Sequence, residues 1–129
     1  MIVLRKAQLE AIQKPAMLDF SARLVAFIQE ECPGQVDGLP ADVLRKRVLW
    51  AQTGAQRLGL TWENSITLFV ACMFQRGPNF FQHPSIRRIF QDPSILPNDR
   101  MHAVMDSVTR EEWAEIESRR DDSLWERAR

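Results

Sequence analysis

The chain has 129 residues with 17 basic and 17 acidic side chains, so its formal net charge is zero. A nucleic-acid-binding domain normally has an excess of basic residues, and this balance therefore argues against a nucleic-acid partner. Hydrophobic residues make up 45% of the chain and charged residues 26%, which is typical of a globular protein and argues against global disorder. The length is that of one domain, and we expect residues 1–129 to form it.

The apolar segments are too short for a membrane-spanning protein. The longest run, residues 68–74, is much shorter than the ~20 residues that a spanning helix needs. Charged side chains within residues 5–10 also interrupt any segment that resembles a signal peptide. We therefore expect no membrane partner and a cytoplasmic location. In that setting Cys32 and Cys72 are expected to be reduced and structural.

Helical periodicity describes the first half of the chain. Apolar residues recur every three or four positions in residues 6–13 and 16–31, and Pro15 is expected to separate these two helices. A further helix is expected over residues 40–58, with Gly59 as its left-handed cap. Its inward stripe is formed by Leu44, Val48, Ala51, Ala55 and Leu58.

The next segment predicts the most buried helix. Thr61 is a favoured N-cap residue, and residues 62–76 are expected to form a helix that Gly77 closes. Apolar side chains cover nearly all sides of this segment, which is typical of a buried helix. We therefore place it at the centre of the domain. Two short helices are expected to follow, over residues 84–91 and 99–108.

Residues 109–129 are expected to form the last helix. Residues 109–112 have the sequence of a capping box, Thr-Arg-Glu-Glu. Trp113, Ile116 and Leu124 then fall on one face of the helix. Because no convincing strand pair is present, the sequence predicts an all-α fold: a single compact multi-helix domain of about six or seven helices around a buried central helix.

No catalytic or metal-binding motif is present. The sequence lacks a Walker loop, a dinucleotide-binding fingerprint, a nucleophile elbow and zinc-finger spacing. His83 and His102 would form a metal site only if the fold brought both to cysteine or carboxylate partners, and surface or helix-capping roles explain them more simply. A helix-turn-helix is disfavoured because residues 62–74 are apolar where a recognition helix is polar and basic. We therefore expect no enzyme activity and no cofactor.

Some large side chains are left over once the core faces of the helices are assigned. Leu49 points away from the inward stripe of its helix, Trp50 borders that stripe, and Trp125 lies off the last apolar stripe and is expected to be exposed. Such apolar groups, with arginine, are typical anchors of protein interfaces. For Trp50 and for the Phe80-Phe81 pair, ordinary core packing is an equal alternative. The candidate protein-binding residues are Leu49, Trp50, Phe80, Phe81, Arg87, Arg88 and Trp125.

Three stretches, which together span most of residues 2–105, form a pattern of spaced apolar and turn residues. They are residues 2–10 (IVLRKAQLE) before a helix with Phe20 and Arg23; residues 57–63 (RLGLTWE) before Met73-Phe74; and Phe80, Pro84 and Ile89 before residues 92–94 (DPS), with Arg100-Met101 beyond. This pattern resembles a group of small all-helical bacterial proteins encoded beside effectors of type VI secretion systems. Residues 109–129 lie outside the resemblance and are a candidate partner-binding extension.

The resemblance implies a non-enzymatic accessory role: an adaptor or chaperone-like factor that binds a bacterial type VI secreted toxin or its loading protein. The alternative is an immunity protein that binds and neutralises a cognate toxin. Immunity proteins often have a strong charge complementary to their target, so zero net charge slightly favours the adaptor. A small enzyme with an unrecognised site is the alternative from another class. The expected partner is another protein, and the sequence leaves a homo-oligomer open.

Overall fold

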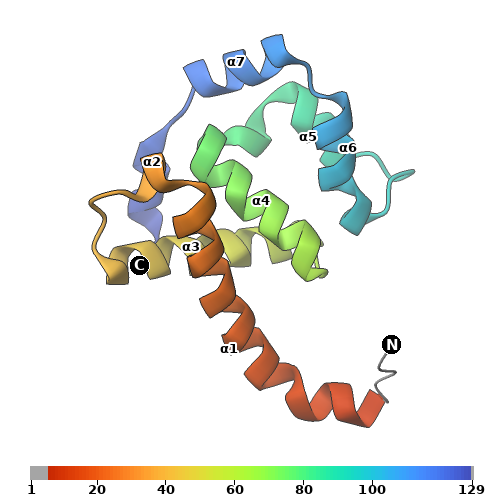
Figure 1. Cartoon of the computed structure of the whole chain (residues 1–129). Helices are drawn as coiled ribbons and strands as arrows, with labels where there is room; N and C mark the ends of the chain where they lie inside the picture. Colours follow the sequence, from red (N-terminus) through yellow and green to blue (C-terminus); the bar gives the residue numbers. More distant parts are fainter. Residues whose placement is uncertain (1–5, 129) are drawn as a thin grey trace.

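The described chain consists of helices and connecting turns in the computed structural model, which covers the backbone of residues 6–128 and the side chains of residues 19–128. Within these residues there is no β-strand, so the predicted all-α fold is confirmed (Figure 1). The elements in chain order are α1 (Lys6–Glu31), α2 (Pro33–Val36), α3 (Ala41–Arg57), α4 (Glu63–Arg76), η1 (Phe80–Gln82), α5 (Pro84–Phe90), η2 (Pro97–Asp99), α6 (Arg100–Ser107), α7 (Arg110–Ser118) and η3 (Asp122–Arg127).

Helix α1 runs unbroken through Pro15. The prediction that Pro15 separates two helices is therefore wrong, since an internal proline removes one backbone hydrogen bond but leaves the helical ladder on either side of it. Figure 1 shows the N-terminal part of α1 extending away from the other helices. Its C-terminal part packs against α2, α3 and α4 through Phe20, Leu24 and Ile28, at the spacing that the sequence predicts.

Helices α3 and α4 pack against each other and are joined by a tight turn. The inward stripe of α3 is buried as predicted, except for Leu58, which is half-buried. Gly59 has a φ of 93°, in the left-handed region that glycine favours, and so confirms the predicted helix cap. The backbone N–H of Leu60 then donates to the carbonyl of Ala55 at 3.1 Å and turns the chain back toward α4.

Helix α4 contacts α1, α2, α3, α6, α7 and η1. Glu63, Asn64 and Gln75 are exposed on it, and Leu68 and Ala71 are half-buried. Its buried side chains are Ser65, Ile66, Phe69, Val70, Cys72, Met73 and Phe74. Burial therefore extends around most, but not all, of this helix.

The start of α4 is organised by Asn98 rather than by Thr61. The N-cap residue is Trp62, which makes no side-chain capping bond, so the predicted Thr61 cap is wrong. Asn98 Oδ1 accepts from the backbone N–H groups of Thr61 and Trp62, each at 2.9 Å. Ser65 Oγ donates to the backbone carbonyl of Asn98 at 2.7 Å. A residue 37 positions further along the chain from Thr61 thus accepts from the two backbone N–H groups that lead into this helix.

Helix α7 begins with the predicted capping box but ends earlier than predicted. Thr109 Oγ1 accepts from the Glu112 N–H at 3.1 Å, and Glu112 Oε1 accepts from the Thr109 N–H at 3.0 Å, which confirms the box. The helix stops at Ser118, and the residues of η3 form a separate turn of 3₁₀ helix. The prediction of one last helix with Trp113, Ile116 and Leu124 on a single face is therefore wrong.

Arg120 redirects the chain between α7 and η3. Its guanidinium donates to the backbone carbonyls of Phe74 (3.0 Å) and Gln75 (3.2 Å) at the C-terminal end of α4. It also pairs with Asp122 at 2.8 Å. Gly77 lies against this side chain with a φ of 127°, and a Cβ added there would be 2.9 Å from Arg120 Cγ. The contact therefore requires glycine at position 77.

We expect Gly77→Ala to lower the free energy of unfolding by about 1–3 kcal/mol, the usual cost of holding a side-chain-bearing residue in such a backbone conformation. The matched control is Gly34→Ala, because no neighbouring atom lies within 4 Å of a Cβ at Gly34 and its φ is ordinary. Denaturant unfolding of both variants tests the expectation. Equal stability of the two variants would show that the Gly77–Arg120 contact does not constrain the fold.

Cys32 and Cys72 are free thiols and both are buried, in agreement with a structural role. Burial raises the pKa of the Cys72 thiol to about 12. Burial also raises the pKa of Cys32, and a hydrogen bond with Gln75 partly opposes this rise. Both thiols therefore stay protonated, and so poorly nucleophilic, at neutral pH.

The raised pKa of Cys72 predicts a loss of stability at alkaline pH. Below the ordinary thiol pKa of 9.0 the group is protonated whether the chain is folded or not. Above it only the unfolded chain releases the proton, so the free energy of unfolding falls by up to about 1.4 kcal/mol per pH unit until the folded-state pKa is reached. We expect denaturant titrations between about pH 9 and pH 11 to give a shallower fall for Cys72→Ala than for the parent. Slopes are compared because this substitution also lowers stability at every pH, and identical slopes would contradict the prediction.

Candidate functional site

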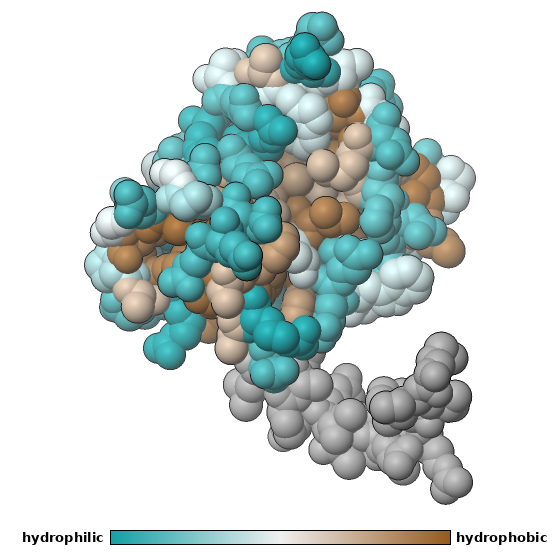
Figure 2. Space-filling view, viewed as in Figure 1, coloured by the Kyte–Doolittle hydropathy of each residue, from teal (hydrophilic) through white to brown (hydrophobic). Residues whose placement is uncertain are grey.

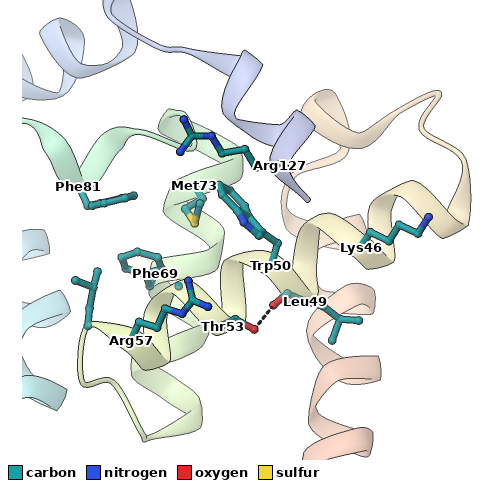
Figure 3. A pocket seen from close by; sticks show the side chains of 11 residues that line it. Lys46, Leu49, Trp50, Thr53, Arg57, Phe69, Met73, Phe81 and Arg127 are labelled. Carbon is teal, nitrogen blue, oxygen red and sulfur yellow. Dashed lines mark hydrogen bonds between the residues drawn. The ribbon is translucent and has the colours of Figure 1, made fainter. Parts of the chain in front are cut away.

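A groove runs along the solvent-facing side of α3, beside its buried stripe. It has a volume of about 540 Å³, within the range of roughly 300–1,000 Å³ that is usual for ligand-binding clefts. Figure 3 shows Phe81 on one side of the groove and Trp50 with Met73 on the other, with Phe69 and Arg57 between them. The groove is lined by Lys46, Leu49, Trp50, Thr53, Gly54, Arg57 and Leu58 of α3 and the turn after it, by Phe69 and Met73 of α4, by Phe81 of η1 and by Arg127 of η3.

Ring contacts hold the aromatic walls in place. Phe69 meets Phe81 with 5.7 Å between ring centroids. On the α3 side, Trp50 meets Trp125 edge-on at 5.7 Å, and Trp125 in turn lies 4.7 Å from Phe74. Each such contact adds about 0.5–1.5 kcal/mol beyond area burial. The wall side chains are therefore fixed by the fold, and the groove exists before any ligand enters.

Three cations surround the apolar walls, and no carboxylate is among the lining residues. Lys46 and Arg57 lie on α3, and Arg127 reaches the groove from η3 (Figure 3). In the part of the chain that the structure describes, none of these three forms an ion pair. The arginines that do are Arg23, Arg76, Arg119 and Arg120. The positive charges at the groove are thus available to a ligand, and the apolar walls strengthen their field.

The polar residue Thr53 and the small residue Gly54 in the lining have no unsatisfied hydrogen-bonding group and no close neighbour that would oppose a ligand. Thr53 Oγ1 donates to the backbone carbonyl of Leu49 at 3.0 Å, so its hydroxyl is satisfied within α3. Gly54 lies in the interior of the helix, where glycine costs about 0.5–1 kcal/mol relative to alanine. A Cβ added at Gly54 would meet nothing within 4 Å. The packing of this chain therefore does not explain why position 54 lacks a side chain.

Three of the seven sequence-predicted binding residues meet at the groove. Leu49 is 42% exposed, which confirms that it points away from the core, and Trp50 and Phe81 are half-buried in the groove wall. Phe80 is instead a core residue with 1% of its surface exposed. Of the two alternatives that the sequence left open, core packing holds for Phe80 and exposure at the groove for Phe81. The 3₁₀ turn of η1 points the Phe80 ring inward and leaves the Phe81 ring at the groove.

Trp125 is 4% exposed, so the expectation of an exposed tryptophan is wrong. The indole instead packs against Trp50 and Phe74, and the Arg47 guanidinium lies 5.5 Å from its ring centroid. Trp125 therefore packs behind the groove wall, and little of its surface is accessible to a partner.

Arg87 and Arg88 are exposed on α5, and the structure does not bring them to the groove. Arg88 lines a smaller cleft with Asp92 and Glu112. The pKa of Glu112 is lowered, mainly by the hydrogen bond from the Thr109 backbone and to a smaller extent by Arg88. The positive charges at the groove therefore come from residues other than the candidates Arg87 and Arg88.

Sequence reasoning did not identify Lys46, Gly54, Arg57 or Arg127 as site residues. The first three recur along the side of α3 outside the inward stripe at helical spacing, and this spacing is the signal that could have found them. Figure 2 shows that apolar surface also remains between hydrophilic side chains on the face viewed. Within the described residues, Leu96 (69%) and Trp62 (60%) are the most exposed large apolar side chains.

His83 lies between a carboxylate and a hydroxyl, an arrangement that resembles a catalytic triad. Its Nε2 is 3.5 Å from Glu115 Oε1, and its Nδ1 is 2.7 Å from Ser85 Oγ. However, Nδ1 also accepts from the Ser85 backbone N–H, which makes His83 the N-cap of α5. Ser85 is buried and does not line the cleft beside His83. No described cavity presents both groups to a substrate, so helix capping explains the geometry.

Neither a metal centre nor a membrane span emerges from the described residues. They contain no group of three or more histidine, cysteine, aspartate or glutamate side chains placed to hold a metal ion. None of their helices combines the length and apolar character needed to cross a bilayer. The chain matches no protein-family model, no curated protein and no solved structure. The groove is therefore the feature on which a functional proposal depends.

The contrast between a supporting and a surface tryptophan is testable. Trp125→Ala removes a buried ring that contacts α3 and α4, and we expect it to lower the free energy of unfolding by about 3–5 kcal/mol. Trp62→Ala removes an exposed ring, and we expect a change within about 0.5 kcal/mol. Denaturant unfolding of both variants provides the comparison. Similar losses for the two would contradict the assignment of Trp125 to the core.

Proposed function

We propose that this chain is a non-enzymatic accessory protein that binds a segment of another protein in the groove along α3. One observation supports the proposal above the others: a preformed apolar groove with the aromatic side chains of Trp50 and Phe81 in its walls and unpaired cations at its edge. Aromatic residues and arginine contribute most of the binding energy in protein interfaces. Burying Trp50 and Phe81 further would thus supply a large part of the affinity.

Within this proposal the partner is a bacterial type VI secreted toxin or its loading protein, and the chain acts as an adaptor or chaperone in the cytoplasm. The resemblance of residues 2–10, 57–63 and 80–94 to proteins encoded beside such effectors supports this partner. A chaperone role also agrees with an apolar groove, because proteins awaiting export expose hydrophobic segments that aggregate unless they are covered.

Neutralisation of a cognate toxin is the second candidate function. The cations Lys46, Arg57 and Arg127 favour it, because such a cluster complements an acidic surface on a toxin. The two functions differ in what binding does. A toxin bound to an adaptor is active once released for delivery, whereas a toxin bound to an immunity protein is inhibited in the complex. A toxin activity assay with and without this chain therefore separates them.

Filling the groove at Gly54 tests the proposal. The chain is co-expressed with each protein encoded by its neighbouring genes, and recovery of each in an affinity purification is measured. We expect Gly54→Leu to reduce recovery of the partner at least tenfold without lowering the melting temperature, because its side chain enters open space. The matched control, Gly54→Ala, leaves most of the volume free and is expected to retain the partner and to gain about 0.5–1 kcal/mol of stability.

Two results would overturn the proposal. Recovery of the partner at parental yield with Gly54→Leu would remove the groove from the binding site. Absence of any co-purifying neighbour with the parent chain would remove the accessory role itself. A Gly54→Leu variant that melts below the parent would show that position 54 is required by the fold, contrary to the open space beside it.

A further inference from the structure

The groove has the length of a short helix. Lys46 and Arg57, the first and last residues that α3 contributes from its regular helical part, are eleven positions apart, or about 17 Å along the axis. About three turns of a second helix cover that distance. Between them the lining positions recur every three or four residues, which is the pattern that a helix presents to a neighbouring helix.

Gly54 lies within this face and permits close approach. Two helices pack with their axes about 8–10 Å apart, and the smaller the residues at the contact, the closer they come. The space beyond Gly54 is empty, and Thr53 next to it has no unsatisfied hydroxyl. A large apolar side chain of a second helix can therefore be accommodated over Gly54, between Trp50 and Phe81.

A helix also suits the chemistry of the groove better than an extended peptide. An extended segment binds through its backbone groups, usually by adding a strand to a sheet edge, and the described residues contain no strand. A helix satisfies its backbone hydrogen bonds internally and needs only an apolar face to enter an apolar groove. The apolar lining residues Leu49, Trp50, Leu58, Phe69, Met73 and Phe81 match that need.

The positive charges at the groove favour an occupant with negative charge. Lys46, Arg57 and Arg127 have no ion-pair partner among the described residues, and the lining has no carboxylate. Residues 1–18 of this same chain carry three basic side chains and one acidic one, so they have the wrong sign to occupy the groove. Helix α7 begins with Glu111 and Glu112, but its apolar residue Ile116 is already buried against the rest of the fold. In a second copy, this acidic helix therefore has its main apolar residue already covered.

We propose that the groove binds one amphipathic helix of another protein, with a large apolar side chain over Gly54 and acidic residues on the flanks that face Lys46, Arg57 and Arg127. This inference rests on the proposed protein-binding function and adds the shape and charge of the segment that is recognised. The apolar face supplies most of the affinity, and the carboxylates set the orientation and raise the association rate.

The test selects helical ligands directly and needs no identified partner. A displayed library of scaffolded helices, randomised over one face and both flanks, is selected on the full chain and counter-selected on Gly54→Leu. We expect the enriched helices to have large apolar residues on the face and an excess of Asp and Glu over Lys and Arg on the flanks. Their binding should weaken as salt concentration rises, because exposed charge pairs are screened.

The strongest selected helix is then measured by fluorescence anisotropy against charge variants of the full chain. We expect Arg57→Glu to weaken its binding on the order of tenfold and Arg87→Glu, an equal charge change outside the groove, to alter it less than about twofold. Arg57→Gln should fall between them. A helix in which the facing acidic residue is replaced by arginine should regain affinity for Arg57→Glu. Melting curves verify that each variant is folded.

Three outcomes would overturn this inference: no enrichment above background, enrichment without an acidic excess, or equal effects of Arg57→Glu and Arg87→Glu. A concentration-dependent dimer that Gly54→Leu abolishes would overturn it too, since the occupant would then be a second copy. None of these outcomes decides the proposed function, which depends on whether a neighbouring gene product is lost with Gly54→Leu. Loss of that protein together with any of the three outcomes would retain the function and reject the acidic helix.

Discussion

The bond between Arg120 and the C-terminal end of α4 is the constraint on which the groove depends. Helix ends leave carbonyl groups without intrahelical partners, and the Arg120 guanidinium satisfies those of Phe74 and Gln75. Gly77 gives it room to approach. Asn79 strengthens the joint, because its amide donates to the Arg119 carbonyl and its oxygen accepts from the Asp121 N–H. These contacts determine where the chain leaves α7.

From that joint the chain continues into η3 and completes the groove. Trp125 is placed against Trp50 and Phe74, and two residues later Arg127 reaches the groove edge. The segment from Thr109 onward was a candidate partner-binding extension. In the structure its last part, η3, contributes one lining cation and a buried tryptophan behind the wall, so this part of the segment is joined to α3 and α4 at the groove.

Local patterns predicted the elements that local interactions determine. The inward stripe of α3, the Gly59 cap and the Thr109–Glu112 capping box all depend on residues within a few positions of one another, and the sequence displays them directly. The exposure of Leu49 was predictable for the same reason, since it follows from helical spacing alone. Three of the eleven groove-lining residues, Leu49, Trp50 and Phe81, were among the residues that the sequence indicated.

Long-range contacts account for the elements that sequence reasoning placed wrongly. Asn98 fixes the start of α4 by accepting from the Thr61 N–H, 37 positions away, and Arg120 bonds 46 positions back along the chain, just after the last regular helix ends. Trp125 is buried for the same reason. The helical periodicity of the sequence does not predict such pairings, because they depend on how the helices are arranged in space. Of the three cations of the groove, Arg127 belongs to the same class, because it joins Lys46 and Arg57 of α3 only after folding.

The joint at Arg120 also has a consequence for the order of folding. Contacts that close a loop of 46 residues form late, because the entropy lost on closing the loop precedes any gain from the contact. Helices α3 and α4 follow each other directly and pair through local contacts, so they assemble earlier. Until the Arg120 contact forms, Trp125 does not cover Trp50 and Phe74, so more apolar surface is exposed than in the finished groove. The groove is thus complete only after the C-terminal segment has docked, because Trp125 and Arg127 are the last parts to be placed.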